Sequence, residues 1–365
     1  MYVYKKKIYI VLFSIIDFLG NIISFPFRMM RRDMPKHFEK ILLIRGDHVG
    51  DVISSTVVLT PLRRAFPAAD IDFLAPSWGL GILKGDPNLT KIIKFDAPWF
   101  DRGIKGFVPW MKGFSGMVKT MKEGDYDLVI DLRGDARHII AMFVSGIKHR
   151  ISYGITGCGF LLTHQIPYKG TMHENQRNAE LLRPLGIECH SPGIKLYFSD
   201  EDILDAGNIK KEVGINYPYA VIHIVPGHPE KKWNKESFAR VARYIHDEKG
   251  LVPVFIGTDE DRADVKDVIE KAGVKAINLS GMTSLSMLGP ILTGSSLFVG
   301  LDSGPSHIAA YTGAPTVILF SGANDPAQWA PEGDNVNVIY PGSGKDLSCI
   351  DAGEVFRTID KVLQK

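Results

Sequence analysis

A carboxylate, a hydroxyl and a glycine follow one another in the turn after an apolar segment that is expected to form a strand over residues 296–300. They are Asp302, Ser303 and Gly304, and a helix is expected to begin at Ser306 or at the next residue. In open parallel sheets, ligands bind beyond the carboxyl ends of the strands, where the free N–H groups of a helix N-terminus favour anions. The turn therefore predicts an anion-binding site, although Asp302 and Ser306 could instead only cap the turn and the helix.

A second carboxylate, Asp51, stands at the expected start of the helix that follows a buried strand at 40–45. A carboxylate in the first helical turn can simply interact with the helix dipole. It can also act as a general base that takes a proton from a hydroxyl nucleophile. Asp47 and His48 are neighbours that could take this role instead, and Gly50 belongs to a glycine-flanked turn that could cradle a phosphate.

A pair of lysines, Lys231 and Lys232, lies in the loop after an expected strand at 220–225. A lysine in this place can reach a diphosphate and neutralise the charge that develops on a leaving group. The alternative is a solvated basic loop. Glu260, just after the next strand, could bind a ribose hydroxyl or be an ordinary helix-start acid. His307, in the first turn of its helix, could donate to a phosphate or satisfy a backbone group.

Strands alternate with helices along most of the chain, which indicates parallel sheets covered on both faces. In the first half we expect strands at 40–45, 71–75, 91–95, 128–132 and 150–153, and helices at 52–66, 108–122, 136–145 and 171–185. In the second half we expect strands at 220–225, 252–257, 296–300 and 315–320, further sheet-completing segments at 276–279 and 284–292, and helices at 236–248, 259–272 and 351–363.

The second half thus restarts the pattern of the first. The polar segment 191–216 is predicted to connect the halves, with the boundary near 210. The fold prediction is α/β, with two Rossmann-like domains (39–210 and 211–342) that face a cleft, followed by a C-terminal helical segment at 343–365. A carboxylate in the first domain, and a lysine and an anion-binding turn in the second, fit group transfer from a diphosphate-activated donor.

The N-terminal segment, residues 1–38, differs from the rest. Residues 8–27 are mostly apolar and are flanked by Lys5 to Lys7 and by Arg28, Arg31 and Arg32. On a helix, the polar or small residues would share one face; they are Ser14, Asp17, Gly20, Asn21 and Ser24. A basic amphipathic helix of this kind suits a membrane surface. A membrane span or signal anchor and a helix packed on the protein's own core are the alternatives.

Composition and missing motifs exclude several classes. The net charge of +2 gives no field that points to nucleic acid. Three widely spaced cysteines do not make a disulfide framework or a zinc site, so a reducing compartment is expected. The turn at 46–51 matches neither a Walker A loop nor the dinucleotide fingerprint, and 73–76 lacks the ribose-binding acid. No metal ion is expected.

Three signatures resemble those of the heptosyltransferases of lipopolysaccharide core synthesis, glycosyltransferase family nine. The first is Ile-Leu-Leu-Ile-Arg-Gly-Asp-His-Val-Gly-Asp-Val at 41–52, followed by Thr60-Pro61-Leu62 and Phe66-Pro67. The second is Pro226-Gly227, then Lys231-Lys232-Trp233 and Phe238-Ala239. The third is the segment 300–310, then 313–316 and 329–331. The signatures occur in order over residues 40 to 335.

The resemblance implies a GT-B fold, with the acceptor in the first domain and the nucleotide sugar in the second. It also implies an inverting transfer that needs no metal ion. It implies that a hydroxyl of a lipopolysaccharide core or other lipid-linked glycan attacks a nucleotide sugar, usually ADP-heptose, at the cytoplasmic face of the inner membrane. By position, Asp51 matches the general base and Lys231 the phosphate-binding lysine. Asp302 matches the residue that contacts the donor sugar, and Ser303 and Gly304 supply N–H groups to the diphosphate. The final helix would cross back onto the first domain.

Two alternatives accompany this interpretation. The chain could use the same fold and mechanism with a different nucleotide sugar, or it could be a catalytically idle scaffold that binds a nucleotide sugar. The N-terminal hydrophobic segment departs from the usual family pattern, and residues 99–122 and 156–169 match the acceptor half only loosely. A third possibility, a Rossmann epimerase or oxidoreductase, is disfavoured by the missing ribose acid.

Overall fold

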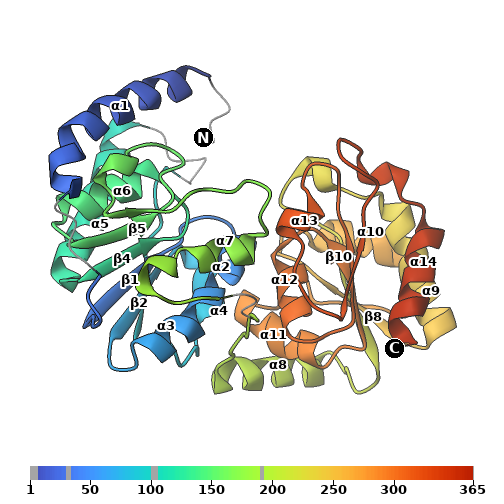
Figure 1. The fold of residues 1–365 in the computed structure, drawn as a ribbon. Coiled ribbons are helices and arrows are strands. Elements are labelled where there is room, and N and C mark those ends of the chain that lie inside the picture. Colours follow the sequence, from blue (N-terminus) through green and yellow to red (C-terminus); the bar gives the residue numbers. More distant parts are fainter. Residues whose placement is uncertain (1–6, 30–33, 100–105, 190–192, 365) are drawn as a thin grey trace. The chain divides into compact units, whose positions relative to one another are not determined.

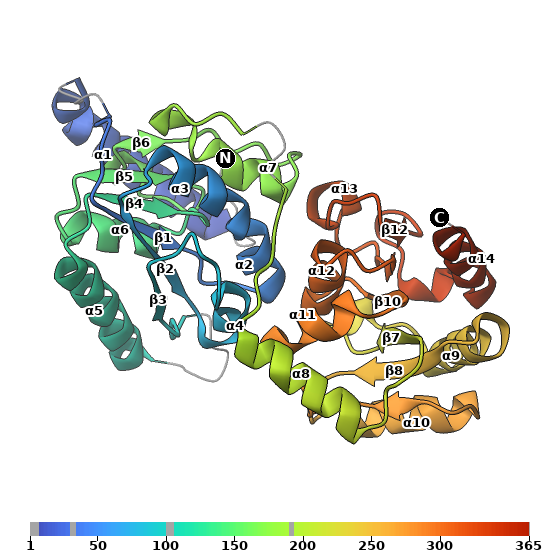
Figure 2. The same cartoon turned by 90° about the horizontal axis from the view of Figure 1, so that it is seen from below.

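Two compact units make up the chain. The computed structural model describes residues 7–29, 34–99, 106–189 and 193–364, and Figures 1 and 2 show its elements. The first unit contains Met1–Leu80 and Asp86–Ile194, and the second contains Gly81–Gly85 and Lys195–Lys365. The short helix α4 (Leu80–Leu83) lies where the chain first passes between them.

The first unit is built on a six-stranded parallel sheet in the order β3-β2-β1-β4-β5-β6. Its strands are β1 (Lys40–Ile44), β2 (Asp70–Ala75), β3 (Lys91–Lys94), β4 (Leu128–Asp131), β5 (His149–Ser152) and β6 (His164–Gln165). Its helices are α1 (Lys7–Met29), α2 (Val49–Ser55), α3 (Leu59–Ala65), α5 (Phe107–Gly124), α6 (Ala136–Val144) and α7 (Glu174–Glu180). The sequence predicted five of these strands and missed the two-residue β6.

Strand β1 shows why the apolar runs of this sequence form a covered parallel sheet. Its residues Ile41 to Ile44 are all fully buried, as expected for a central strand with helices on both faces. Leu42 and Ile44 share a core with Met117 of α5 and Ile139 of α6. Ile41 and Leu43 point to the opposite face because successive side chains alternate along a strand.

The predicted helix at 52–66 is broken. The structure has α2, a 3-10 turn over Thr56–Val58, and then α3. Pro61 is the cause, because its missing N–H and its ring disturb the helix one turn earlier. The side chains of Ser55 and Thr56 donate to Val52 O and Ile53 O across the break.

The second unit carries another six-stranded parallel sheet, in the order β12-β11-β10-β7-β8-β9. Its strands are β7 (Tyr219–His223), β8 (Val252–Ile256), β9 (Ile277–Asn278), β10 (Leu297–Leu301), β11 (Thr316–Leu319) and β12 (Val336–Ile339). Its helices are α8 (Asp200–Glu212), α9 (Lys235–Lys249), α10 (Arg262–Ala272), α11 (Leu285–Thr293), α12 (Gly304–Tyr311), α13 (Pro326–Trp329) and α14 (Ala352–Leu363). The predicted pair of Rossmann-like sheets is therefore confirmed, and β12 was not predicted.

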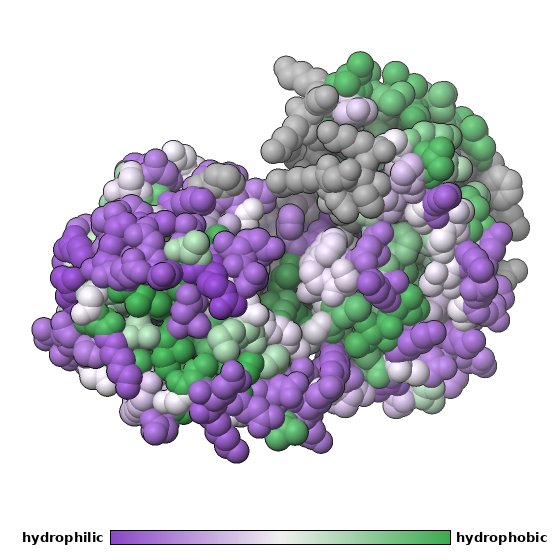
Figure 3. Space-filling view, turned by 180° about the vertical axis from the view of Figure 1, so that it is seen from behind, coloured by the Kyte–Doolittle hydropathy of each residue, from purple (hydrophilic) through white to green (hydrophobic). Residues whose placement is uncertain are grey.

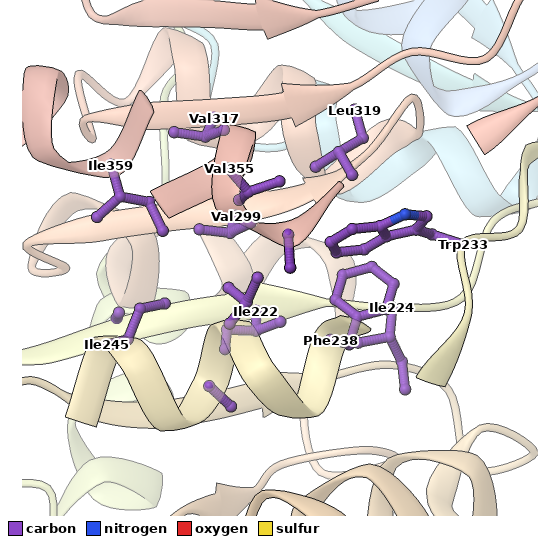
Figure 4. Packing of buried hydrophobic residues seen from close by; sticks show 14 of the residues in the cluster. Ile222, Ile224, Trp233, Phe238, Ile245, Val299, Val317, Leu319, Val355 and Ile359 are labelled. Carbon is purple, nitrogen blue, oxygen red and sulfur yellow. The ribbon is translucent and has the colours of Figure 1, made fainter. Parts of the chain in front are cut away.

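A helix lies near each end of this unit. The segment predicted as a polar connection contains α8, which belongs to the second unit, so that the units divide at 194/195 rather than near 210. The last helix, α14, packs on the core of its own unit, where its Val355 and Ile359 join Val299, Trp233 and other residues shown in Figure 4.

Both sheets have the strand order of a doubly wound fold. In each, the chain adds strands outward on one side of its first strand and then changes to the other side at a single switch point. In the first sheet this switch lies between β1 and β4, and in the second it lies between β7 and β10. Crevices at such switch points, beyond the carboxyl ends of the strands, are where ligands bind in open α/β sheets. Asp51 lies in the first turn of α2, which follows β1, and Lys231 and Asp302 lie in the segments that follow β7 and β10.

Candidate functional site

The first unit gathers three carboxylates around one arginine at its switch point. Arg45 directly follows β1, and its guanidinium contacts Asp47 at 2.6 Å, Asp51 at 2.7 Å and Glu174 at 3.0 Å. It also donates to Leu132 O after β4, at 2.6 Å. We call Arg45, Asp47, Asp51 and Glu174 the Arg45 cluster. It joins the two strands on either side of the switch to helix α7.

Two of the three acids have a further cation, which decides how their charges differ. Asp47 also pairs with Arg133 at 3.1 Å, and Glu174 pairs with Arg177 one helical turn later. Asp51 shares only Arg45 among the ion pairs of the described residues, and its carboxylate accepts the His48 backbone N–H at 3.3 Å. Asp51 is thus the member of the cluster with the weakest compensation.

Burial raises the pKa of Asp51 to about 7, with Asp47 and Glu174 adding to the rise and Arg45 opposing it. Burial also acts on Asp47, but Arg45 and Arg133 outweigh it and lower the pKa of Asp47. A general base works best when its pKa lies near the working pH. The environment therefore favours Asp51 over Asp47 as a base, and the ion pair with Arg45 does not contradict this because that arginine is divided among three acids.

A buried turn after β4 positions Arg133. The carboxylate of Asp131 accepts the N–H groups of Gly134 and Asp135, at 2.9 and 3.0 Å, and the hydroxyl of Ser152 at 2.8 Å. His138 of α6 contacts its other oxygen at 2.9 Å. With every one of these groups buried, the turn has a fixed shape, and Arg133 is held against Asp47.

In the second unit, the structure brings Lys231 and Asp302 together at the switch point between β7 and β10. Lys231 Nζ lies 2.5 Å from Asp302 Oδ2, and the two side chains are only 13% and 8% exposed. Asn324, in the loop after β11, donates to the same oxygen at 2.7 Å. Asp302 Oδ2 thus accepts from both Lys231 and Asn324. A lysine and a carboxylate side by side can bind a ligand that has both phosphate and hydroxyl groups.

The turn before α12 offers N–H groups to an anion at the same place. Ser303 is the N-cap residue and its side chain does not cap the helix; it donates to Leu301 O at 3.0 Å and lies 3.2 Å from His223 Nδ1. Burial lowers the pKa of His223 to about 4, so the ring is neutral at pH 7. The first N–H groups of a helix have no acceptor within the helix. Here they are those of Ser303 and Gly304, because Pro305 has no N–H and the Ser306 N–H donates to Ser303 O at 3.2 Å. His307 is buried in the same first turn.

Three other predicted residues lie beside Asp51 or at a neighbouring strand end. Gly50 and His48 lie at the start of α2 beside Asp51, and His48 is exposed. Glu260 is exposed in the turn after β8, where Asp261 accepts the N–H and the hydroxyl of Thr258. The structure therefore places Glu260 at the next strand end rather than in the Lys231–Asp302 pair.

Sequence reasoning missed the residues that complete both sites. Arg45 could have been found as a charged residue at the end of an apolar strand. Glu174 and Arg177 could have been found as oppositely charged residues one turn apart on a helix. Asn324 gives no comparable signal, because loop asparagines are common turn residues. Within the described residues, no group of three or more His, Cys, Asp and Glu side chains could hold a metal ion.

Comparisons with known proteins agree with this architecture. A family model described as glycosyltransferase family 9 (heptosyltransferase) matches residues 115–357. Lipopolysaccharide heptosyltransferase 3 of Escherichia coli K12 is 27% identical over 339 residues, which cover 86% of this chain and 95% of the relative. The lipopolysaccharide core heptosyltransferase OpsX of Haemophilus influenzae is 23% identical over 312 residues, which cover 83% and 85%.

Solved structures show the same fold. A family 9 glycosyltransferase from Veillonella parvula has a TM-score of 0.79 at 24% identity, covering 91% of this chain and 99% of that one. The Escherichia coli ADP-heptose lipopolysaccharide heptosyltransferase II has a TM-score of 0.73 at 21% identity, covering 89% and 98%. The fold is thus the two-sheet GT-B type. Since the family model covers more than half of a chain whose two sheets have this fold, the protein belongs to glycosyltransferase family 9, the heptosyltransferases, and is a glycosyltransferase.

Proposed function

We propose that the protein transfers a heptose from ADP-heptose to a hydroxyl of a lipopolysaccharide core or other lipid-linked glycan, with inversion at the anomeric carbon. The observation that carries the catalytic part is Asp51, a carboxylate with a pKa of about 7 at the switch point of the first sheet. The named relatives that act as heptosyltransferases support the choice of sugar.

In the proposed reaction, the acceptor oxygen bonds to the anomeric carbon while its proton passes to Asp51. The bond between that carbon and the diphosphate breaks, and ADP leaves. Lys231 meets the negative charge that develops on the leaving diphosphate, together with the N–H groups of Ser303 and Gly304. Once Lys231 turns to the phosphate, Asp302 accepts hydrogen bonds from hydroxyl groups of the sugar. These groups supply the charge stabilisation for which other transferases use a cation, so the proposed reaction needs no metal ion.

The donor is tested by titrating the purified protein with ADP, UDP and GDP, and then with their sugar conjugates, in a buffer containing EDTA. Selective binding of ADP and ADP-heptose, followed by turnover with a core acceptor, is the expected result. Preference for UDP or GDP would keep the mechanism and reject the sugar. Binding without turnover on any acceptor would support the idle scaffold instead.

Glu174 is expected to tune the base without touching the substrate. Replacing it in Glu174→Gln removes a negative charge that raises the pKa of Asp51. The acid limb of the kcat/KM profile, which reports Asp51 in the free enzyme, should therefore move to lower pH. The measurement is a pH profile between 5 and 9, with Glu180→Gln at the other end of α7 as the control. A limb that stays in place or moves to higher pH would show that Glu174 does not set the pKa of the base.

A further inference from the structure

Helix α1 presents an apolar face to the outside of the first unit. Its most exposed large residues include Ile8, Val11, Phe18, Ile22, Ile23 and Phe25, which are 58–72% exposed. Figure 3 shows hydrophobic side chains gathered over this helix. Residues Ile8–Phe25 are also long and apolar enough to cross a membrane, and 6% of them are buried. Apolar surface of this extent marks an interaction site.

The opposite face of α1, which carries the small and polar residues, docks on the folded unit. Asp17 Oδ1 accepts the backbone N–H of Cys158 at 2.7 Å. Gly20 is buried, and a side chain there would collide with the ring of Phe160 at 2.5 Å. Phe13 lies against Gly157 in the same way and joins the core of the unit. In a helix that covers a water-soluble core, the apolar residues face inward; α1 has the reverse arrangement.

These contacts distinguish a helix in the membrane plane from one that spans the membrane. The residues that dock, 13 to 20, occupy the middle of α1. If the middle of the helix lay at the centre of a bilayer, the segment 157–160 would enter the hydrocarbon together with its polar backbone groups, which lipid cannot satisfy. Docking in the middle is compatible only with a helix whose one side faces lipid and whose other side faces protein.

The charges at both ends of α1 identify the kind of lipid surface. Lys5, Lys6 and Lys7 precede the apolar residues, and Arg28, Arg31 and Arg32 follow them. Basic residues at both ends suit a helix whose two ends lie at the same layer of headgroups. Each such residue near an anionic membrane surface contributes roughly 1 kcal/mol of attraction. A second copy of the chain, which carries the same positive ends, would lack this complementarity.

We propose that α1 lies in the plane of an anionic membrane leaflet. The hydrogen bond between Asp17 and the Cys158 N–H, and the contact between Gly20 and Phe160, would then fix the first unit to that leaflet. This rests on the proposed function only in that a lipid-linked acceptor gives the surface a purpose. Thr156, two residues before Cys158, links this contact to the site, because its Oγ1 accepts the N–H of Ala136 at 2.6 Å, beside the turn that holds Arg133. The height of the Arg45 cluster above the membrane is therefore set by folded contacts and not by a loose tether.

Vesicle binding by the full chain tests the surface. Wild-type protein should float with vesicles that contain phosphatidylglycerol and bind phosphatidylcholine vesicles less well. The double variant Val11→Glu/Ile22→Glu should lose binding by about tenfold or more, because charged residues on an interfacial face oppose insertion and anionic lipid repels them. The matched control, Ile203→Glu/Leu204→Glu on the exposed face of α8, should bind as the wild type does. The proposal would be overturned if the α1 variant bound vesicles as the wild type does. It would also be overturned if the wild type self-associated instead of binding lipid and the α1 variant lost that self-association.

Depth measurements test the orientation. Spin labels are introduced by Ile8→Cys, Ile15→Cys and Ile22→Cys in a variant whose Cys158, Cys189 and Cys349 are serine. In-plane docking predicts equal, shallow depths for the three labels, whereas a span predicts that the label at position 15 is the deepest. Turnover with a lipid-free soluble acceptor is measured in parallel. Wild-type protein that turns over the soluble acceptor but does not bind the vesicles would reject the membrane proposal alone. Wild-type protein that binds the vesicles but does not turn over the acceptor would reject the proposed reaction alone.

Discussion

Replacing Asp51 by asparagine is expected to lower kcat by about 10²- to 10⁴-fold, the usual contribution of a positioned general base. Asparagine keeps the shape and the contact with Arg45 but cannot take a proton. In the wild type, kcat/KM should rise with pH through about 7 as Asp51 loses its proton. Both results are read from initial rates at saturating and limiting acceptor, and ADP affinity should stay unchanged.

The same substitution is expected to stabilise the fold above pH 7. Native Asp51 keeps its proton up to a pH of about 7, whereas in the unfolded chain it loses it near the ordinary value of 3.8. The native state thus binds more protons in this interval, and stability falls as the pH rises through it. Asp51→Asn carries no such cost. Its Tm should exceed the wild-type Tm at pH 8, and the difference should shrink as the pH approaches 4.

Asp47→Asn separates the two candidate bases. Because the pKa of Asp47 is already low, Asp47→Asn should keep the rise of activity with pH. The rise should move to lower pH, because the charge of Asp47 helps to raise the pKa of Asp51. If Asp51→Asn retains near-wild-type turnover while Asp47→Asn removes the pH dependence, the roles are reversed. If Asp51→Asn is less stable than the wild type at pH 8, ionisation of the buried Asp51 carboxyl does not destabilise the native state as its raised pKa indicates.

Lys231→Ala is expected to lower kcat/KM by about 10²- to 10³-fold, the range seen when one group that stabilises developing charge is removed. Donor affinity should fall as well, because the lysine would contact the diphosphate in the ground state. The neighbour Lys232 is exposed, so Lys232→Ala is the matched control and should change both constants little. Calorimetric titration with ADP and steady-state rates measure the two effects.

A folding defect must be separated from a catalytic one. Lys231→Ala leaves the buried carboxylate of Asp302 with Asn324 but without its cation, and unpaired buried charges are costly. Lys231→Arg keeps the charge and should recover stability fully and activity in part. If Lys231→Ala melts as the wild type does and keeps its rate and ADP affinity, the proposed phosphate role is wrong.

Much of the fold could be predicted because its strands are continuous apolar runs. Strands such as 40–45 and 128–132 differ from the observed bounds by one residue, since burial on both faces leaves an unambiguous pattern. Helix α8 was missed because it is stabilised at its start by a Ser199–Asp202 capping box and buries only Asp202 and Ala206. With so few apolar positions, its sequence reads as a polar linker.

The sites could be predicted only where chemistry and position coincide in one loop. Asp51, Lys231 and Asp302 lie in the segments that connect β1, β7 and β10 to the following helices, and these carboxyl ends of strands are where α/β folds bind ligands. Glu174 lies far from Arg45 in sequence, and their contact depends on how α7 packs against α2, which no local pattern encodes. Asn324 is similar, because its contact with Asp302 requires that β11 neighbour β10.

In the donor site that we propose, the ion pair between Lys231 and Asp302 places an anion of the protein where the diphosphate would bind. A diphosphate must displace an aspartate that is already 2.5 Å from the lysine. The measured affinity for a nucleotide is therefore a difference between two interactions with Lys231, and it understates the strength of the newly formed one. The same aspartate can re-form its pair as ADP departs, so an internal anion helps to expel the product and returns the enzyme to its starting state.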